Sequence, residues 1–183
     1  MNDLPLLTGY SPELRQQASA LLESGRLAQV LAKRYPNGHE VNSNKALNTY
    51  VQELKSRHMK TAPPLAQVLF DNQLHHAHNA LGIHRTSTRV QGTKLRKRRE
   101  VRVASLFKET PPEFLRMIVV HELAHMKHQE HNAAFYKLCV HMESDYHQYE
   151  LDLRLLLTAQ EWKREDGSGK ADSSGPGDPR ASQ

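Results

Sequence analysis

The segment from His121 to His125 reads His-Glu-Leu-Ala-His, and it constrains the fold more than any other stretch of the chain. Residues four apart lie on one face of an α-helix, so His121 and His125 can both point at one metal ion. Glu122 lies about 100° further round the helix, within reach of a water beside that ion but outside the row of ligands. Imidazole nitrogens suit Zn²⁺. The pattern therefore predicts a helix that carries part of a zinc site.

The residues around this motif argue against a chance match, although the chain contains twelve histidines. Residues 117–120 are apolar, and Leu123, Ala124 and Met126 fill the remaining helix positions, so the helix is expected to be buried. Buried polar side chains cost free energy unless they have a partner. A metal ion would be that partner.

A third ligand must come from outside the pair, because a catalytic zinc site takes three protein ligands and one water. His131 is the first candidate. Asn132 is a good N-cap for a new helix, so His131 would lie on the turn that folds back under the two helical histidines. Glu143, a carboxylate at the following helix, is the alternative. We favour His131.

The run from His121 to Tyr136 resembles the signature of the YgjP-like metal-dependent hydrolases, a family classed among the zinc metallopeptidases. The resemblance covers roughly residues 5 to 158, and it is carried further by three upstream segments, Leu31–Pro36, Ser87–Gly92 and Phe114–Val120.

The resemblance implies a site as well as a family. It places the metal ligands on His121, His125 and His131 and the catalytic glutamate on Glu122. The expected cofactor is one Zn²⁺ per chain, for which another divalent transition metal such as Mn²⁺ or Co²⁺ could substitute.

Length and composition bound the architecture. The 183 residues suffice for one domain with its own core. We expect a single YgjP-like metallohydrolase domain over residues 1–162. Its expected fold is α+β and zincin-like, mostly helical with a small antiparallel sheet beside the helix that carries the motif. Residues 163–183 are rich in Gly, Ser, Asp, Pro and Lys, which is typical of a disordered polar tail.

Local signals mark several helix ends. Ser11 followed by Pro12 predicts a helix start, and a break is expected near residues 24–25. Either Ser43 or Asn44 caps a second helix. Thr110, followed by two prolines and a glutamate, predicts a capping box that starts the motif helix, whose end is expected between residues 127 and 130.

A basic hairpin is expected between the two strands 86–91 and 100–105. Its loop, residues 92–99, contains Lys94 and four further basic residues. The loop is either a solvated tip or a rim that binds phosphate, and Arg89 and Lys94 are the candidate substrate-binding residues. No aromatic residue interrupts the basic run, which argues against stacking on single-stranded nucleic acid. The net charge of +5 favours anionic partners without identifying one.

The remaining chemistry-bearing residues are expected to be structural. Histidines 75, 76, 78 and 84 fall on different faces of a predicted helix, so we expect an exposed helix and no second metal site. His141 and His147 are expected to orient a ligand or to lie at the surface. Cys139, the single cysteine, excludes an internal disulfide and is expected in the core. No membrane-length apolar run or leader is present, so a soluble, cytoplasmic protein is expected.

Three functions fit these residues. The first is a metallopeptidase that acts on peptides, in which a zinc-acidified water attacks and Glu122 moves the proton. The alternative is a nucleoside triphosphate pyrophosphatase that converts UTP to UMP and diphosphate, a form that the resemblance suggests, with the basic hairpin holding the polyphosphate. The third is a non-enzymatic, zinc-stapled binding module, in which Glu122 would have no role. The motif predicts the catalyst and leaves the substrate open.

Overall fold

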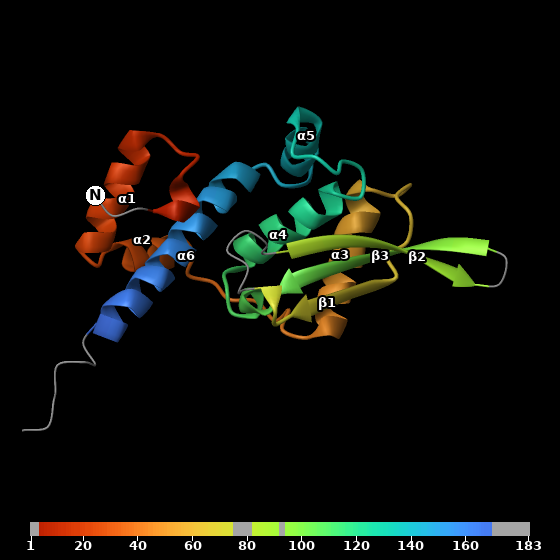
Figure 1. Cartoon of the computed structure of the whole chain (residues 1–183), viewed down its shortest axis with the longest axis horizontal. Coiled ribbons are helices and arrows are strands. Elements are labelled where there is room, and N and C mark those ends of the chain that lie inside the picture. The colour runs from red at the N-terminus through yellow and green to blue at the C-terminus, as the bar shows by residue number, and fades with distance from the viewer. Residues whose placement is uncertain (1–3, 75–81, 92–93, 170–183) are drawn as a thin grey trace, which may run out of the picture. The chain divides into compact units, whose positions relative to one another are not determined.

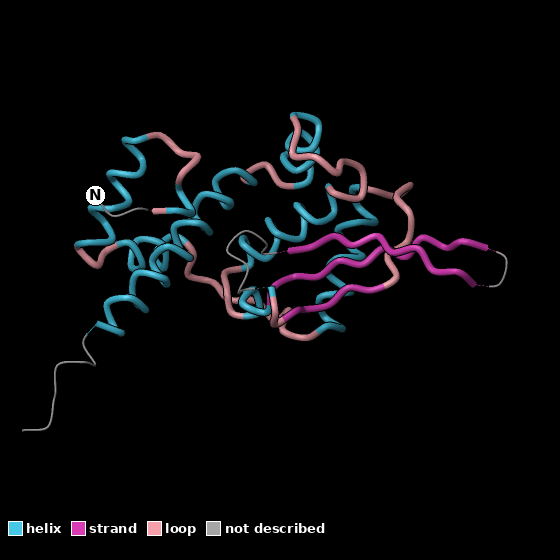
Figure 2. Tube along the Cα trace, viewed as in Figure 1, coloured by secondary structure: helices cyan, strands magenta, loops and turns pink. Residues whose placement is uncertain are grey.

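The computed structural model describes residues 4–74, 82–91 and 94–169, with side chains described over 4–74 and 99–164. It divides into two compact units: Met1–Arg34 with Leu151–Gln183, and Tyr35–Glu150. Figure 1 labels the elements and Figure 2 separates helices from strands. Within the described residues, no helix combines the length and the apolar character that a membrane crossing requires.

The first unit is helical. It contains the 3₁₀ turn η1 (Pro5–Leu7), α1 (Pro12–Glu23), α2 (Leu27–Arg34) and the later part of α6 (Tyr146–Gly169). Ser11 caps α1 by accepting a hydrogen bond from the backbone N–H of Leu14 at 3.3 Å, as predicted. The predicted break after α1 is also confirmed, at Gly25, whose φ of 67° favours glycine. Arg34 donates to the buried carboxylate of Asp152 at 2.8 Å.

The second unit builds a three-stranded sheet in the order β1-β3-β2. The antiparallel pair is β2 (Gly82–Gln91) and β3 (Lys94–Ala104), and β1 (Gln67–Asp71) runs parallel to β3. The sheet is therefore mixed and not simply antiparallel, because β1 and β3 run in the same direction while β2 and β3 run in opposite directions. Alternate residues of β1 and β3 are buried, namely Val68, Phe70, Val101 and Val103. This period of two is that of a strand with one covered face.

The hairpin strands are longer than expected. Strand pairing begins at Lys94 opposite Gln91, so most of the predicted basic loop 92–99 is strand, and only residues 92–93 of it lie outside the described residues. The polar composition resembled a loop, but long basic side chains do not prevent a backbone from pairing with a neighbouring strand. In Figure 1 the β2–β3 pair extends beyond α4 (Pro112–Ala124).

Helices cover this sheet. The helix α3 (Asn44–His58) packs against β1, and α4 packs against β2 and β3, as Figure 1 shows for the second unit. Ser43 caps α3 by accepting from the N–H of Ala46 at 3.2 Å. The 3₁₀ turn η3 (Ser105–Lys108) leads from β3 to α4. Nine residues of α4 are buried, which makes it the central helix of this unit.

The predicted capping box at the start of α4 is wrong. Thr110 is buried at the end of η3 and its hydroxyl donates to the carbonyl of Phe107 at 3.4 Å, while Pro111 occupies the N-cap position without a side-chain hydrogen bond. Proline has no backbone N–H, so a proline at the start of a helix leaves no unsatisfied donor there. The hydroxyl therefore serves the preceding turn and not the helix.

Two helices complete the chain, α5 (Ala133–Met142) and α6. The structure continues α6 to Gly169, seven residues beyond Trp162, which was the last residue of the expected domain. Residues 170–183 lie outside the described residues, so the disordered tail stays a prediction.

Candidate metal centre

Two of the predicted ligands lie at the C-terminal end of α4. The helix ends at Ala124, earlier than expected, and His125 is its C-cap. The backbone of His125 nevertheless stays helical, with φ −62° and ψ −16°, and its N–H donates to the carbonyl of His121 at 3.3 Å. This last helical turn preserves the spacing of four residues, so both imidazoles face the same way.

The third predicted ligand comes from the turn between α4 and α5. Asn132 caps α5 by accepting from the backbone N–H of Phe135 at 3.0 Å, as the sequence predicted. His131 precedes this cap and is exposed. The start of α5 therefore fixes the point at which the chain turns back toward α4.

The structure brings the three histidines together. The Nε2 atom of His131 lies 3.2 Å from Nε2 of His121 and 3.1 Å from Nε2 of His125, and the two helical histidines are 3.3 Å apart at the same atoms. Bonds of about 2.0–2.1 Å in a tetrahedral zinc site separate two ligand nitrogens by roughly 3.3–3.4 Å. Among the described residues this is the group of potential metal ligands that converges. The triad therefore fits a zinc ion.

The hydrogen bond behind the ring of His125 favours the same conclusion. Nδ1 of His125 lies 3.0 Å from the backbone carbonyl of His128. A carbonyl only accepts, so Nδ1 must carry the proton, and Nε2 of the neutral ring presents its lone pair to the triad. Burial lowers the pKa of His125, although the hydrogen bond to His128 opposes this shift. The neutral form that can bind metal is thereby favoured.

A phenylalanine lies behind all three imidazoles. The ring centroid of Phe135 is 5.0 Å from that of His121, 4.7 Å from that of His125 and 4.8 Å from that of His131. Phe135 is fully buried in α5. It therefore closes the inner side of the triad with an apolar surface that limits the freedom of the three rings.

The predicted catalytic residue, Glu122, is almost completely buried, with 1% of its surface exposed. It directly follows His121 in α4. A buried carboxylate that follows a metal-binding histidine in a helix is a candidate general base for a water molecule that the metal would hold.

The alternative third ligand, Glu143, lies elsewhere. Its carboxylate accepts a hydrogen bond from Arg116 of α4, which also donates to the carbonyl of Met142 at 2.8 Å. Desolvation alone would lower the pKa of Arg116, but the hydrogen bond and charge of Glu143 raise it above its ordinary value. Glu143 therefore ties the end of α5 to α4.

Sequence reasoning did not connect Phe135 or Tyr146 with the site. The hydroxyl oxygen of Tyr146 lies 2.7 Å from Nδ1 of His121. No short sequence pattern predicts this contact, because the two residues are 25 positions apart in the chain. Of the two histidines expected to orient a ligand or lie at the surface, His147 is exposed beside Tyr146, and His141 is exposed with its ring edge-on to His58.

Other candidate residues lie outside this geometry. The strand register places Arg89 opposite Arg96 and Lys94 opposite Gln91, and the side chains of all four lie outside the described residues. Histidines 75, 76 and 78 also lie outside them, so the exposed helix expected there stays a prediction. For His84 the prediction of a helix is wrong, because its backbone lies in β2, although its side chain is outside the described residues. Cys139 is buried, and burial raises the pKa of its thiol to about 12, which confirms it as a core residue.

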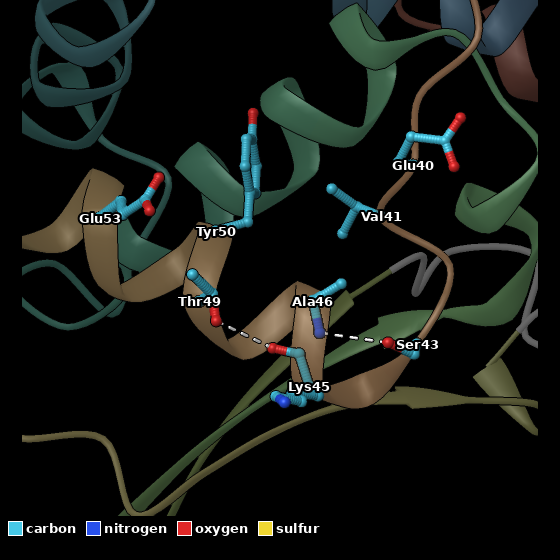
Figure 3. Close-up of a pocket in the computed structure, with 8 residues that line it drawn as sticks. All are labelled: Glu40, Val41, Ser43, Lys45, Ala46, Thr49, Tyr50 and Glu53. Atoms are coloured by element: carbon cyan, nitrogen blue, oxygen red, sulfur yellow. Dashed lines mark hydrogen bonds between the residues drawn. The ribbon is translucent and has the colours of Figure 1, made fainter.

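A separate pocket of about 430 Å³ lies along α3 and the segment before it (Figure 3). It is lined by Glu40, Val41, Ser43, Lys45, Ala46, Thr49, Tyr50 and Glu53. Figure 3 shows the hydroxyls of Ser43 and Thr49 engaged with the backbone of α3 itself. None of the triad residues lines this pocket, and the hydroxyls of Ser43 and Thr49 bond to the helix itself.

Comparisons with known proteins agree with this site. A family model described as YgjP-like, metallopeptidase domain, matches residues 6–155. The chain is also 52% identical over 158 residues to a protein named UTP pyrophosphatase from Escherichia coli (strain K12), an alignment that covers 86% of this chain and 95% of that protein. No solved structure matches the chain.

These findings give first a class and then a family. A convergent histidine triad and a hydrolase family model define a metal-dependent hydrolase. The chain belongs to the YgjP-like metallopeptidase-domain family, which confirms the resemblance seen in the sequence.

Proposed function

We propose that this chain is a zinc-dependent nucleoside triphosphate pyrophosphatase that hydrolyses UTP to UMP and diphosphate. The observation that carries the proposal is the 52% identity to the UTP pyrophosphatase of Escherichia coli, over 95% of that protein. Identity at this level over nearly the full relative supports a shared substrate better than the family description supports a peptide. The proposal therefore reverses the order of preference that the sequence alone gave.

In this proposal His121, His125 and His131 hold one Zn²⁺ through their Nε2 atoms, whose separations of 3.1–3.3 Å support the assignment. When bound, the ion supplies Lewis acidity and a water whose pKa is lowered to roughly 7. The chain's own contribution is to keep the imidazoles neutral and oriented, with Phe135 excluding water from their inner side.

Glu122 is the proposed general base. It takes a proton from the attacking water and returns it to the diphosphate that leaves. The water oxygen forms a bond to the α-phosphorus, and the bond from that phosphorus to the bridging oxygen breaks. UTP and one water thus balance UMP and diphosphate. The burial of Glu122 beside His121 supports this role, because a desolvated carboxylate is a stronger base than an exposed one.

The β2–β3 hairpin is the proposed polyphosphate-binding element, with Arg89 and Lys94 as its substrate-binding residues. The register sets Arg89 directly opposite Arg96. Like charges opposite one another destabilise a strand pair unless an anion lies between them. A triphosphate would relieve this repulsion, which supports the assignment.

We also propose a zincin-like arrangement in one functional domain. The motif helix α4 packs against a sheet, which supports the first proposal. The family match over residues 6–155 takes in segments of both compact units, which supports treating residues 1–162 as one domain.

Peptide hydrolysis remains the second candidate, because the family description names a metallopeptidase domain. One structural observation favours it. The sheet order leaves β2 at an edge, with β3 as its neighbour among the described strands. An extended peptide can add to such an edge as a further strand. The catalytic residues would be the same for both substrates.

The test is hydrolysis by the zinc-loaded protein of UTP, CTP, ATP and GTP in parallel with a mixed peptide library. We expect diphosphate release that is fastest with UTP and that falls by about 10²–10⁴-fold in Glu122→Gln, because general base catalysis contributes that much. Glu130→Gln, which changes an exposed glutamate in the turn after α4, is the matched control and should retain activity.

The outcomes separate the candidates. Peptide cleavage that disappears in Glu122→Gln, without diphosphate release, would make the protein a peptidase. Bound zinc with neither activity would favour the non-enzymatic, zinc-stapled module.

A further inference from the structure

The hydroxyl of Tyr146 lies behind the triad, on the side away from the converging Nε2 atoms. Tyr146 is the first residue of α6 and is completely buried. Its oxygen is 2.7 Å from Nδ1 of His121, and the two rings are nearly parallel, with an interplanar angle of 14° and centroids 6.3 Å apart. This geometry agrees with a hydrogen bond in the plane of the imidazole, the direction in which an Nδ1–H points.

We propose that Tyr146 is a positioning residue, which fixes the Nδ1–H tautomer and the ring orientation of His121 so that Nε2 of His121 presents its lone pair to the metal. The inference rests on the proposed metal site and adds to it a residue that acts through His121 and does not touch substrate.

The convergence of the three Nε2 atoms indicates the direction of this hydrogen bond. Nε2 of His121 lies 3.3 Å from Nε2 of His125 and 3.2 Å from Nε2 of His131, so it faces the place where a metal ion would bind. A neutral imidazole that offers its Nε2 lone pair to a metal carries its proton on Nδ1, and the hydroxyl oxygen of Tyr146 is the group placed to accept a hydrogen bond from it.

The position of Tyr146 is itself held by the protein. Its backbone N–H donates to the carbonyl of Glu143 at 3.2 Å. The carboxylate of Glu143 is in turn bound by Arg116 of α4, the helix that carries His121. Tyr146 is thus connected to α4 twice, by the contact of its hydroxyl with His121 and through Glu143 by Arg116. These two connections keep the hydroxyl aligned with the imidazole.

The two helical histidines are then oriented by different means. His125 donates its Nδ1 proton to the backbone carbonyl of His128, three residues further along the chain. No side-chain substitution removes this acceptor. His121 depends on a side chain, and it can therefore be tested by mutation. Partners that orient a metal-binding histidine typically contribute 10–100-fold to metal affinity.

The test compares Tyr146→Phe with wild type and with Tyr149→Phe. Tyr149→Phe is the matched control, because it removes a hydroxyl from the same helix that contacts Asp145 and not the triad. Zinc affinity is measured by competition with a chelator. We expect Tyr146→Phe to weaken zinc binding by about 10–100-fold and Tyr149→Phe to leave it within about twofold of wild type. Equal affinity of Tyr146→Phe and wild type would overturn the proposal.

A second measurement has its deciding outcome in the wild-type protein, so it can refute the proposal even if the variant does not fold. Long-range ¹H–¹⁵N NMR of the histidine rings in the metal-free wild-type protein reports which nitrogen carries the proton. We expect His121 in the Nδ1–H form, and a shift toward Nε2–H in Tyr146→Phe. A wild-type His121 in the Nε2–H form would refute the assignment. Neither readout uses turnover, so a failure of UTP hydrolysis is distinguishable from a failure of this inference.

Discussion

The guanidinium of Arg116 in α4 binds the carboxylate of Glu143, the residue that ends α5. This ion pair is partly buried, with 29% and 12% of the two side chains exposed. It joins the motif helix to the helix that packs behind the triad, and it occupies the carboxylate that was the alternative to His131 as third ligand.

The ion pair predicts that Glu143 serves stability and not metal binding. Glu143→Gln should retain one bound zinc per chain while lowering the free energy of unfolding by about 1–3 kcal/mol, because a hydrogen bond to a charged group is lost from a partly buried site. Metal analysis and urea unfolding measure the two effects. A variant that unfolds like wild type but binds no zinc would identify Glu143 as a ligand.

The triad predicts that each histidine is needed for metal affinity. His121→Ala, His125→Ala and His131→Ala should each weaken zinc binding by more than tenfold, because each removes one of three protein ligands. His128→Ala is the matched control, since His128 contributes its backbone carbonyl and not its side chain. Chelator competition gives the affinities. Wild-type affinity in the His131 variant would exclude the turn histidine.

Bound zinc is predicted to be lost in mild acid. Burial lowers the pKa of His125 below its ordinary value, so the folded protein favours the neutral ring. The resulting stabilisation is complete above the unfolded pKa of about 6.5 and is lost as the pH falls through the lower folded value. Protons also compete with the metal for the imidazoles. Zinc retention on dialysis should therefore be full near pH about 7.5 and fall steeply toward pH about 5.

Circular dichroism across the same pH range checks that the protein stays folded. Zinc fully retained at the acidic end in a folded protein would contradict histidine ligation.

The hairpin register predicts a role for Arg89 and Lys94 in substrate binding. Arg89→Ala and Lys94→Ala should each raise KM for UTP by about tenfold while leaving zinc affinity unchanged, because a charge-assisted contact to phosphate is removed. The control is Arg57→Ala, which removes an exposed charge from α3. Steady-state kinetics at fixed ionic strength measure the change. Equal KM values in all three variants would reduce the hairpin to a solvated tip.

The sequence by itself determined the local part of the site. The spacing of His121 and His125 needs only the geometry of one helical turn, and Asn132 caps α5 through a hydrogen bond that spans three residues. Ser11 and Gly25 likewise mark helix ends through their own backbone preferences. These interactions link residues that are close together in the sequence, so they can be predicted without knowledge of the fold.

Tertiary structure alone decided which distant groups meet. It set Tyr146 behind His121, Phe135 beneath three imidazoles and β1 beside β3. It also ended α4 at Ala124 and extended the hairpin strands. These features depend on contacts between residues far apart in the chain, whose formation requires loop closure and the packing of whole helices and strands. No pattern within a few residues indicates which of the possible long-range contacts will form.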